Sequence, residues 1–142
     1  MRIDYSSGME QVKRLFAEDQ FAKLAGIEIV EIQPGHAVCR MEIQPQHLNG
    51  LKTVHGGAIF TLADFAFAVA SNSHGVPAMA INASISFLKA ATAGVLRAEA
   101  KEVSLHAKLA TYTVDITDAT GARIALFQGT VYRKSDKSLV KG

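Results

Sequence analysis

Residues 56–75 read GGAIFTLADFAFAVASNSHG, and this stretch decides the fold. Apart from Thr61, Asp64 and the polar residues near its end, every position from 57 to 73 is apolar or glycine. A helix with no polar face is a buried one. In a chain of 142 residues, burial on every side requires a sheet that wraps around the helix or a second subunit that covers it. We therefore predict a central buried helix over residues 57–73, with Gly75 as its C-terminal cap.

The segments before and after this helix have the patterns of β-strands. Two β-rich runs, 27–33 and 37–43, precede the helix and are separated by Pro34-Gly35. This dipeptide suits a type II turn, because glycine tolerates a positive φ. Four longer runs follow the helix, at residues 77–89, 94–103, 109–117 and 122–132. Runs joined by short connections pair antiparallel, because parallel crossovers need a dozen or more residues.

The first strand after the helix alternates between apolar and polar residues. In the run 77–89, Met79 and Ile85 belong to the apolar positions, and Asn82 and Ser84 belong to the polar ones. This alternation predicts that Met79 and Ile85 share one face of the strand, with Asn82 and Ser84 on the other.

The remaining segments complete the predicted plan. Residues 118–121, Asp-Ala-Thr-Gly, have the composition of a hairpin turn into the last strand. Residues 8–24 carry apolar side chains at helical spacing among charged ones, which predicts a surface helix. We predict one α+β domain over residues 1–142, in which a curved antiparallel sheet of five to six strands wraps around the central helix.

The composition argues against several classes of partner. The formal net charge is +2 and there is no basic run, so we expect no nucleic acid. The single cysteine, Cys39, allows no internal disulfide, favours a reducing compartment and alternates with core residues of its strand. Residues 1–16 lack the apolar segment of a secretion signal, and the apolar stretch 56–70 is too short to span a bilayer. We therefore expect a cytoplasmic protein that does not bind membranes.

Asp64 is the exception within the apolar helix. An ionised carboxylate in such a position is costly unless it is paired or partly hydrated. The residues three and four positions away are Phe60, Thr61, Phe67 and Ala68, so no cation lies beside it on the helix. Two interpretations remain open: an aspartate bonded to a distant backbone group, or a general base or nucleophile in a cleft of low polarity.

Histidine, asparagine and glycine gather at the start of the same helix. Just before the helix or at its first turn lie His47, Asn49, His55 and the pair Gly56-Gly57. Glycines in this position expose backbone N–H groups at the positive end of the helix dipole. Such N–H groups can stabilise a developing oxyanion.

The spacing of Gly56 and Asp64 has a consequence for assembly. Eight residues of helix separate them by roughly 12 Å along the axis, at about 1.5 Å per residue. One small reacting group cannot contact both positions in the same chain. If both act on one substrate, a second, antiparallel copy of the helix has to bring them together. The sequence therefore predicts a homodimer with two shared sites.

The segment HLNGLKTVHGGAIFTLADFAFAVASNSHG, residues 47–75, closely resembles the phenylacetic acid degradation (PaaI-like) thioesterases of the hot-dog superfamily. The similarity continues through ASISFLKAATAG, residues 83–94, and covers nearly the whole chain. It implies a hot-dog fold, hydrolysis of acyl-CoA thioesters, often arylacetyl-CoA, and homodimers that pair into tetramers. Coenzyme A is then part of the substrate, and no cofactor is implied.

The resemblance also implies roles for individual residues. Asn49 matches the family asparagine that orients the thioester or the attacking water. Gly56 matches the glycine whose N–H polarises the thioester carbonyl, with His55 beside it. Asp64 matches the catalytic carboxylate, which acts as general base on water or as direct nucleophile. Where some relatives place a serine on the first long strand after the helix, the nearest positions of this chain are Ala80 and Asn82.

Further residues are predicted to contact the substrate. Because CoA carries phosphates, we expect basic residues at the rim of the site, and Lys89, Arg133 and Lys134 are the candidates. Gly57 and Asn82 complete the predicted substrate contacts. No histidine pair has the close helical spacing of a zinc site, so we predict no metal.

Three functions compete for this site. The first is an acyl-CoA thioesterase, and the second is a non-catalytic module that binds acyl-CoA. The third is a hot-dog hydratase or dehydratase, whose histidine generally has prolines nearby that the run 53–56 lacks. The sequence leaves the acyl group open, since its phenylalanines fit either an aryl pocket or ordinary core.

Overall fold

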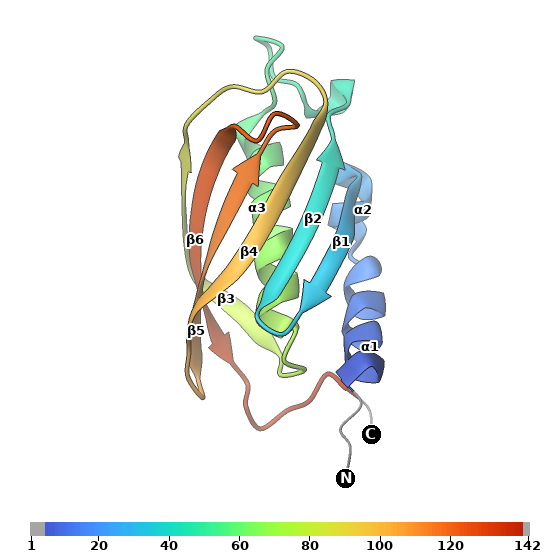
Figure 1. The fold of residues 1–142 in the computed structure, drawn as a ribbon, viewed down its shortest axis with the longest axis vertical. Coiled ribbons are helices and arrows are strands. Elements are labelled where there is room, and N and C mark those ends of the chain that lie inside the picture. The colour runs from blue at the N-terminus through green and yellow to red at the C-terminus, as the bar shows by residue number, and fades with distance from the viewer. Residues whose placement is uncertain (1–4, 141–142) are drawn as a thin grey trace.

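A central helix and a curved sheet make up the fold (Figure 1). The computed structural model describes residues 5–140, so both ends of the predicted 1–142 domain, including the first residues considered for a secretion signal, lie outside the described part. Helix α3 (Gly56–Asn72) lies against the concave face of a six-stranded antiparallel sheet. The strands are β1 (Ile27–Gln33), β2 (His36–Glu42), β3 (Ala78–Phe87), β4 (Val95–Leu105), β5 (Leu109–Thr117) and β6 (Arg123–Arg133). Their spatial order is β1-β2-β4-β5-β6-β3, which confirms the predicted α+β plan.

The two predicted turns form where the sequence places them. Gly35 adopts a φ of 73°, which the second central position of a type II turn requires, between β1 and β2. At the turn between β5 and β6, the Asp118 carboxylate accepts hydrogen bonds from the backbone N–H groups of Thr120 and Ala122. Gly121 in the same turn has a φ of 86°. Both hairpins are therefore confirmed.

The predicted N-terminal helix is instead two helices. Helix α1 (Tyr5–Ala17) ends before Asp19, and helix α2 (Gln20–Ala25) begins after it. The Asp19 side chain accepts a hydrogen bond from Ala22 N at 2.9 Å and caps α2. Aspartate prefers this capping position to a helix interior, because its short carboxylate competes for backbone N–H groups. Both helices lie beside the β1 edge of the sheet (Figure 1).

Strand β3 departs from the predicted alternation at a β-bulge. Ala80 pairs with Val131 and Asn82 pairs with Thr130, so Ile81 is the extra residue on β3. The bulge shifts the phase of the strand, and Ala80 rather than Met79 shares the inner face with the buried Val131. The prediction for Met79 was therefore wrong, and its side chain is more than half exposed.

Helix α3 is buried on most of its surface. Leu62, Ala66 and Phe67 on this helix are at most 1% exposed and pack against the sheet. One stripe is open in the single chain, because Gly57 is exposed and Thr61 and Asp64 are half-buried. The sheet, together with α1 and α2, thus supplies the burial expected for this apolar helix on all sides but one.

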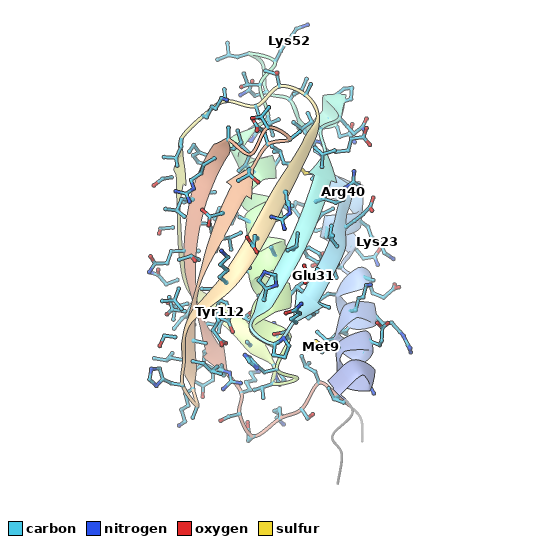
Figure 2. The ribbon with its side chains drawn as sticks, viewed as in Figure 1. Met9, Lys23, Glu31, Arg40, Lys52 and Tyr112 are labelled. Carbon is cyan, nitrogen blue, oxygen red and sulfur yellow. The ribbon has the colours of Figure 1, made fainter. Side chains whose placement is uncertain are left out.

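The connection into α3 extends past the end of the sheet. A short 3₁₀ helix, η1 (Pro45–His47), follows β2 and leads into the loop 48–54. Lys52 lies near the tip of this loop (Figure 2). Within residues 5–140, no helix has the length and apolar character needed to cross a membrane.

Candidate functional site

The N-terminus of α3 has one unused hydrogen-bond donor. His55 caps the helix: its Nδ1 accepts from Gly57 N at 2.8 Å, and its carbonyl accepts from Ala58 N and Ile59 N. Gly56 N–H, the remaining donor of the first turn, has no partner among the described residues. An unpaired N–H at this end of a helix carries the positive end of the dipole, so Gly56 can donate to an incoming oxygen.

His47 fixes the position of the chain that enters the helix. Its Nδ1 accepts from Gln44 N at 2.9 Å, and its Nε2 lies 2.7 Å from Ala25 O at the end of α2. The backbone carbonyl of His47 accepts from His55 N at 2.7 Å. The buried imidazole thereby joins α2 to the start of η1, and the backbone of the same residue joins η1 to the start of α3, which is a structural role.

Asn49 organises the loop before α3. Its Oδ1 accepts from Leu51 N and Thr53 N, and its Nδ2 donates to Thr53 Oγ1 at 3.0 Å. The side chain therefore satisfies the turn of its own loop in this single chain. Orientation of a thioester or a water by Asn49 stays a prediction.

Asp64 lies on the open stripe of α3 without a partner. Among the described residues it makes no hydrogen bond or ion pair. Burial is the main cause that raises the pKa of Asp64, and the negative charge of Asp19 raises it further. A small cavity of about 140 Å³ opens beside the carboxylate, with Asp19, Phe21 and Phe65 among the residues that line it. An unpaired carboxylate with increased proton affinity in a cavity suits a general base or a nucleophile.

The two chemical groups are far apart within one chain. Gly56 and Asp64 belong to the same helix, at a separation of roughly 12 Å along its axis. Gly56 opens on a different cavity of about 420 Å³, which Phe87, Leu88 and Lys89 also line. Each chain thus presents an N–H donor and a carboxylate on separate cavities.

The predicted substrate contacts do not all gather at these cavities. Lys89 lines the Gly56 cavity, and its Nζ lies 3.8 Å from Asp118 Oδ2. Gly57 lines a third cavity of about 600 Å³ between α3 and α2. Asn82 pairs with Thr130 and lies on the convex face of the sheet, away from α3.

Arg133 lies at the opposite end of the sheet from Lys89. It pairs with Ala78, the first residue of β3, whereas the cavity at Gly56 lies beside Phe87, the last. The Arg133 side chain is 9% exposed, and its Nη1 donates to His106 O at 2.9 Å. Its buried Nε has no partner in the described part of the chain. One chain therefore does not bring Lys89 and Arg133 together.

Sequence reasoning missed the contribution of α2. Asp19 and Phe21 line the Asp64 cavity although they lie more than 40 positions away in the sequence. The available signal was Asp19 itself, a strong N-cap residue in the middle of a predicted helix.

Cys39 is fully buried in β2, which confirms its core role, and burial raises the pKa of its thiol to about 12. Residues 5–140 contain no group of three histidine, cysteine, aspartate or glutamate residues able to hold a metal ion.

Comparisons with known proteins agree on one family. The family model described as "Thioesterase superfamily" matches residues 51–125. A protein of Archaeoglobus fulgidus is 45% identical over 133 residues, which cover 92% of this chain and 86% of the relative. Acyl-coenzyme A thioesterase PaaI of Escherichia coli is 38% identical over 120 residues, which cover 84% and 86%.

Solved structures agree with this similarity. The structure of E. coli PaaI, from the phenylacetic acid degradation operon, has a TM-score of 0.86 and 35% identity, with 91% of this chain and 94% of that chain covered. A hypothetical thioesterase from Streptococcus pneumoniae, solved with coenzyme A, has a TM-score of 0.79 and 26% identity and covers 85% and 95%. The curved sheet around α3 is thus the hot-dog arrangement that the sequence predicted.

Proposed function

The chain belongs to the thioesterase superfamily, and on that premise we propose that it hydrolyses acyl-CoA thioesters to a free acid and CoA. The observation that carries the proposal is a pair of unpaired groups on α3. Gly56 N–H is a free donor at the positive end of the helix, and Asp64 is a half-buried carboxylate without a cation. These are the oxyanion donor and the base that thioester hydrolysis requires.

The reaction places the thioester between two subunits. Gly56 N–H of one subunit donates to the thioester carbonyl oxygen, and Asp64 of the other takes a proton from water. The water oxygen bonds to the carbonyl carbon, and the tetrahedral oxyanion forms at the Gly56 N–H. When the oxyanion collapses, the carbon–sulfur bond breaks and CoA leaves as a thiolate, which is then protonated. Direct attack by Asp64 gives an acyl anhydride that water hydrolyses, and both routes use the same two groups.

The free edge of β3 supports a second subunit beside the first. β3 ends the sheet and pairs only with β6 among the strands described. Met79, Ile81 and Phe87 on it are each more than half exposed. An apolar, unpaired edge strand is a ready site for strand pairing with another chain. We propose a homodimer through this edge, and the PaaI-like resemblance adds a pairing of two dimers.

The substrate class follows from the relatives and from Lys89. The E. coli relative is an acyl-coenzyme A thioesterase, and the pneumococcal neighbour was solved with coenzyme A. Lys89 lies at the cavity of the oxyanion donor, where its ammonium can reach a CoA phosphate. We propose an arylacetyl-CoA such as phenylacetyl-CoA, or a short to medium straight-chain acyl-CoA.

The N–H of Gly56 can be tested by a matched pair of variants. Gly56→Pro removes the N–H, and proline fits the first position of a helix after His55, whose ψ of 136° is extended. Gly56→Ala keeps the N–H and adds the same Cβ, 3.1 Å from Phe87 Cζ. Loss of an oxyanion donor costs about 100-fold to 1000-fold in kcat, so release of thiol from phenylacetyl-CoA falls by that factor in the proline variant only. An equal fall in kcat in both variants would contradict a role of the Gly56 N–H in the reaction.

Asp64→Asn tests the carboxylate, and a mixing experiment tests the sharing. The nearly isosteric amide lowers kcat by at least about 100-fold if Asp64 is the base. When inactive Gly56→Pro and Asp64→Asn chains are refolded together, half of the dimers are mixed, and each mixed dimer has one intact shared site. The mixture then recovers about a quarter of wild-type activity. A mixture that stays inactive while both homodimers fold contradicts the shared site.

The competing functions predict different outcomes of the same assay. A non-catalytic module binds phenylacetyl-CoA and releases no thiol, in wild type and in Asp64→Asn alike. A hydratase leaves the thioester intact and changes the absorbance of a 2-enoyl-CoA. Release of free CoA by wild type contradicts both.

A further inference from the structure

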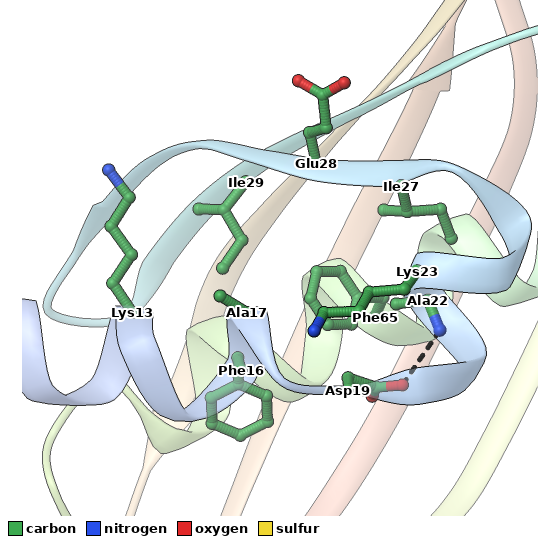
Figure 3. Close-up of a pocket in the computed structure, with 10 residues that line it drawn as sticks. All are labelled: Lys13, Phe16, Ala17, Asp19, Ala22, Lys23, Ile27, Glu28, Ile29 and Phe65. Carbon is green, nitrogen blue, oxygen red and sulfur yellow. Dashed lines mark hydrogen bonds between the residues drawn. The ribbon is translucent and has the colours of Figure 1, made fainter.

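A cleft lies between the N-terminal helices and strand β1 (Figure 3). Its volume is about 280 Å³. The side chains of Ile27 and Ile29 point from β1 toward the helices, while Glu28 between them points away (Figure 3). Phe16 and Ala17 of α1 and Phe65 of α3 also line the cleft. Its walls are therefore mainly apolar.

This cleft adjoins the cavity of Asp64. Asp19, Ala22 and Phe65 line both spaces, so the two share a wall. Ala22 is small, and the Phe65 side chain belongs to the helical turn that follows Asp64. The two spaces are therefore neighbours, and the buried side chains of Ala22 and Phe65 are what separates an acyl chain on a carbonyl carbon beside Asp64 from the cleft.

The charged groups at the rim of the cleft already have partners or lie in solvent. Lys23 Nζ is 3.2 Å from Glu18 Oε2, and Glu28 Oε2 is 3.5 Å from Arg40 Nη1. Asp19 Oδ1 accepts from Ala22 N (Figure 3). Lys13 is exposed on α1. The interior thus offers apolar contact and little hydrogen bonding, which suits a hydrocarbon group.

We propose that this cleft binds the acyl group of the thioester and limits its length. The inference rests on the proposed hydrolysis at Asp64 and names the part of the substrate that the catalytic groups leave open. A water-sized group occupies about 30 Å³, so the cleft holds roughly nine non-hydrogen atoms. A phenylacetyl or octanoyl group fits this space, and a palmitoyl chain exceeds it.

A substitution at Ala17 tests the cleft without touching the catalytic groups. Ala17 is the exposed last residue of α1, so Ala17→Leu fills the cleft with little effect on folding. The matched control is Ala107→Leu, at an exposed position in the β4–β5 connection that lines none of these cavities. We expect Ala17→Leu to lower kcat/KM for octanoyl-CoA and phenylacetyl-CoA by at least about 10-fold. The value for acetyl-CoA stays unchanged, and Ala107→Leu resembles wild type on all three.

A second variant and a binding measurement separate this inference from the proposed function. Ile29→Ala enlarges the cleft and raises activity on dodecanoyl-CoA relative to octanoyl-CoA. Equilibrium binding of acyl-CoA to the Asp64→Asn protein measures the contribution of the cleft to affinity without turnover. Each methylene buried in the cleft should tighten binding by about fourfold. Tighter binding of octanoyl-CoA than acetyl-CoA, lost in Ala17→Leu, supports the cleft even if wild type hydrolyses nothing. Equal affinity for octanoyl-CoA and acetyl-CoA, or an equal fall of kcat/KM on every substrate in Ala17→Leu, overturns the assignment of the cleft while leaving the proposed hydrolysis intact.

Discussion

Gly129 lies where two opposing effects on stability can be weighed. It is buried in β6, and a Cβ added there would lie 2.7 Å from Phe67 Cζ and 3.0 Å from Phe127 Cε1. Carbon atoms pack best at about 3.5–4.0 Å, so alanine at this position overlaps Phe67 by about 1 Å. Phe67 is 1% exposed and packs against the rings of Tyr112 and Phe127, at centroid distances of 5.9 and 5.3 Å. The ring therefore has no space into which it can retreat.

The relative size of the two effects decides whether Gly129→Ala stabilises or destabilises the fold. Replacing glycine by alanine reduces the entropy of the unfolded chain, which stabilises by about 0.4–1 kcal/mol where the backbone is compatible. Overpacking a dense core costs about 1–3 kcal/mol. We expect Gly129→Ala to lose about 1–2 kcal/mol of unfolding free energy, the difference of these two effects. With an m-value of about 2 kcal/mol per molar urea, the unfolding midpoint falls by about 0.5–1 M.

A control and a double variant make the test specific. Gly50→Ala adds a Cβ with nothing within 4 Å, at a glycine without a positive φ, so its stability should equal or exceed that of wild type. Phe67→Leu removes the ring edge that alanine at 129 would meet. The double variant should then be more stable than the sum of the single changes predicts, by about 0.5–3 kcal/mol. Urea unfolding at one fixed subunit concentration measures wild type and the four variants. A Gly129→Ala chain as stable as wild type, or additive changes, would refute the reasoning.

Three further predictions concern buried or capping groups. Tyr112 is fully buried, and its hydroxyl donates to Glu102 Oε1 at 2.7 Å. Tyr112→Phe should therefore lower the free energy of unfolding, measured in urea, by about 1.5–3 kcal/mol. The control Tyr132→Phe, at a half-exposed tyrosine, should lower it by less than about 0.5 kcal/mol. Because burial and Asp19 raise the pKa of Asp64 above 3.8 in the folded chain, the folded state keeps this proton to higher pH than the unfolded state does. The free energy of unfolding of wild type therefore falls relative to that of Asp64→Asn as pH rises above about 4, the pKa of an aspartate in an unfolded chain, and stops falling once the folded carboxyl is ionised. Urea unfolding at a series of pH values measures this, and a constant difference between the two proteins contradicts it. His55→Ala should destabilise α3 by about 1 kcal/mol through loss of its cap, and His55→Asn should restore it, as thermal unfolding can report.

The main elements could be predicted because their signals are local. The run of α3 is apolar except for Thr61 and Asp64 and the polar residues near its end, and its observed start at Gly56 lies one residue before the predicted one. Pro34-Gly35 and residues 118–121 carry turn chemistry in consecutive positions, so both hairpins follow from the sequence alone.

The wrong predictions concern features that leave no local signal. The apolar spacing of residues 8–24 continues across Asp19, so periodicity could not reveal that the aspartate caps a second helix. The bulge at Ile81 adds a residue to one strand only, and alternation counted along that strand cannot detect it. The pattern therefore placed Met79 on the wrong face.

In the candidate site, too, the residues with a local signal could be predicted, and those placed by packing could not. Asp64 was predicted because it is a charge within an apolar run, and Gly56 because the N–H groups at the start of that helix can meet an oxyanion. The resemblance to PaaI-like thioesterases gave each residue its role. The position of Asp19 beside Asp64 depends on how α2 packs against α3, which sequence spacing does not encode. Arg133 was chosen for its charge alone, and charge says nothing about which end of the sheet a residue occupies.

The open stripe of α3 carries a combination that stability alone would not favour. Asp64 costs folding energy, because burial and Asp19 both oppose its ionisation and no described cation offsets them. Thr61 and Ala68 beside it are small, and they leave a cavity where larger side chains could pack. A leucine in place of Asp64 would bury apolar area there and extend the core to this side of the helix. A costly charge kept next to unfilled space is expected where function and stability compete, and α2 supplies both the second charge and the wall of that space.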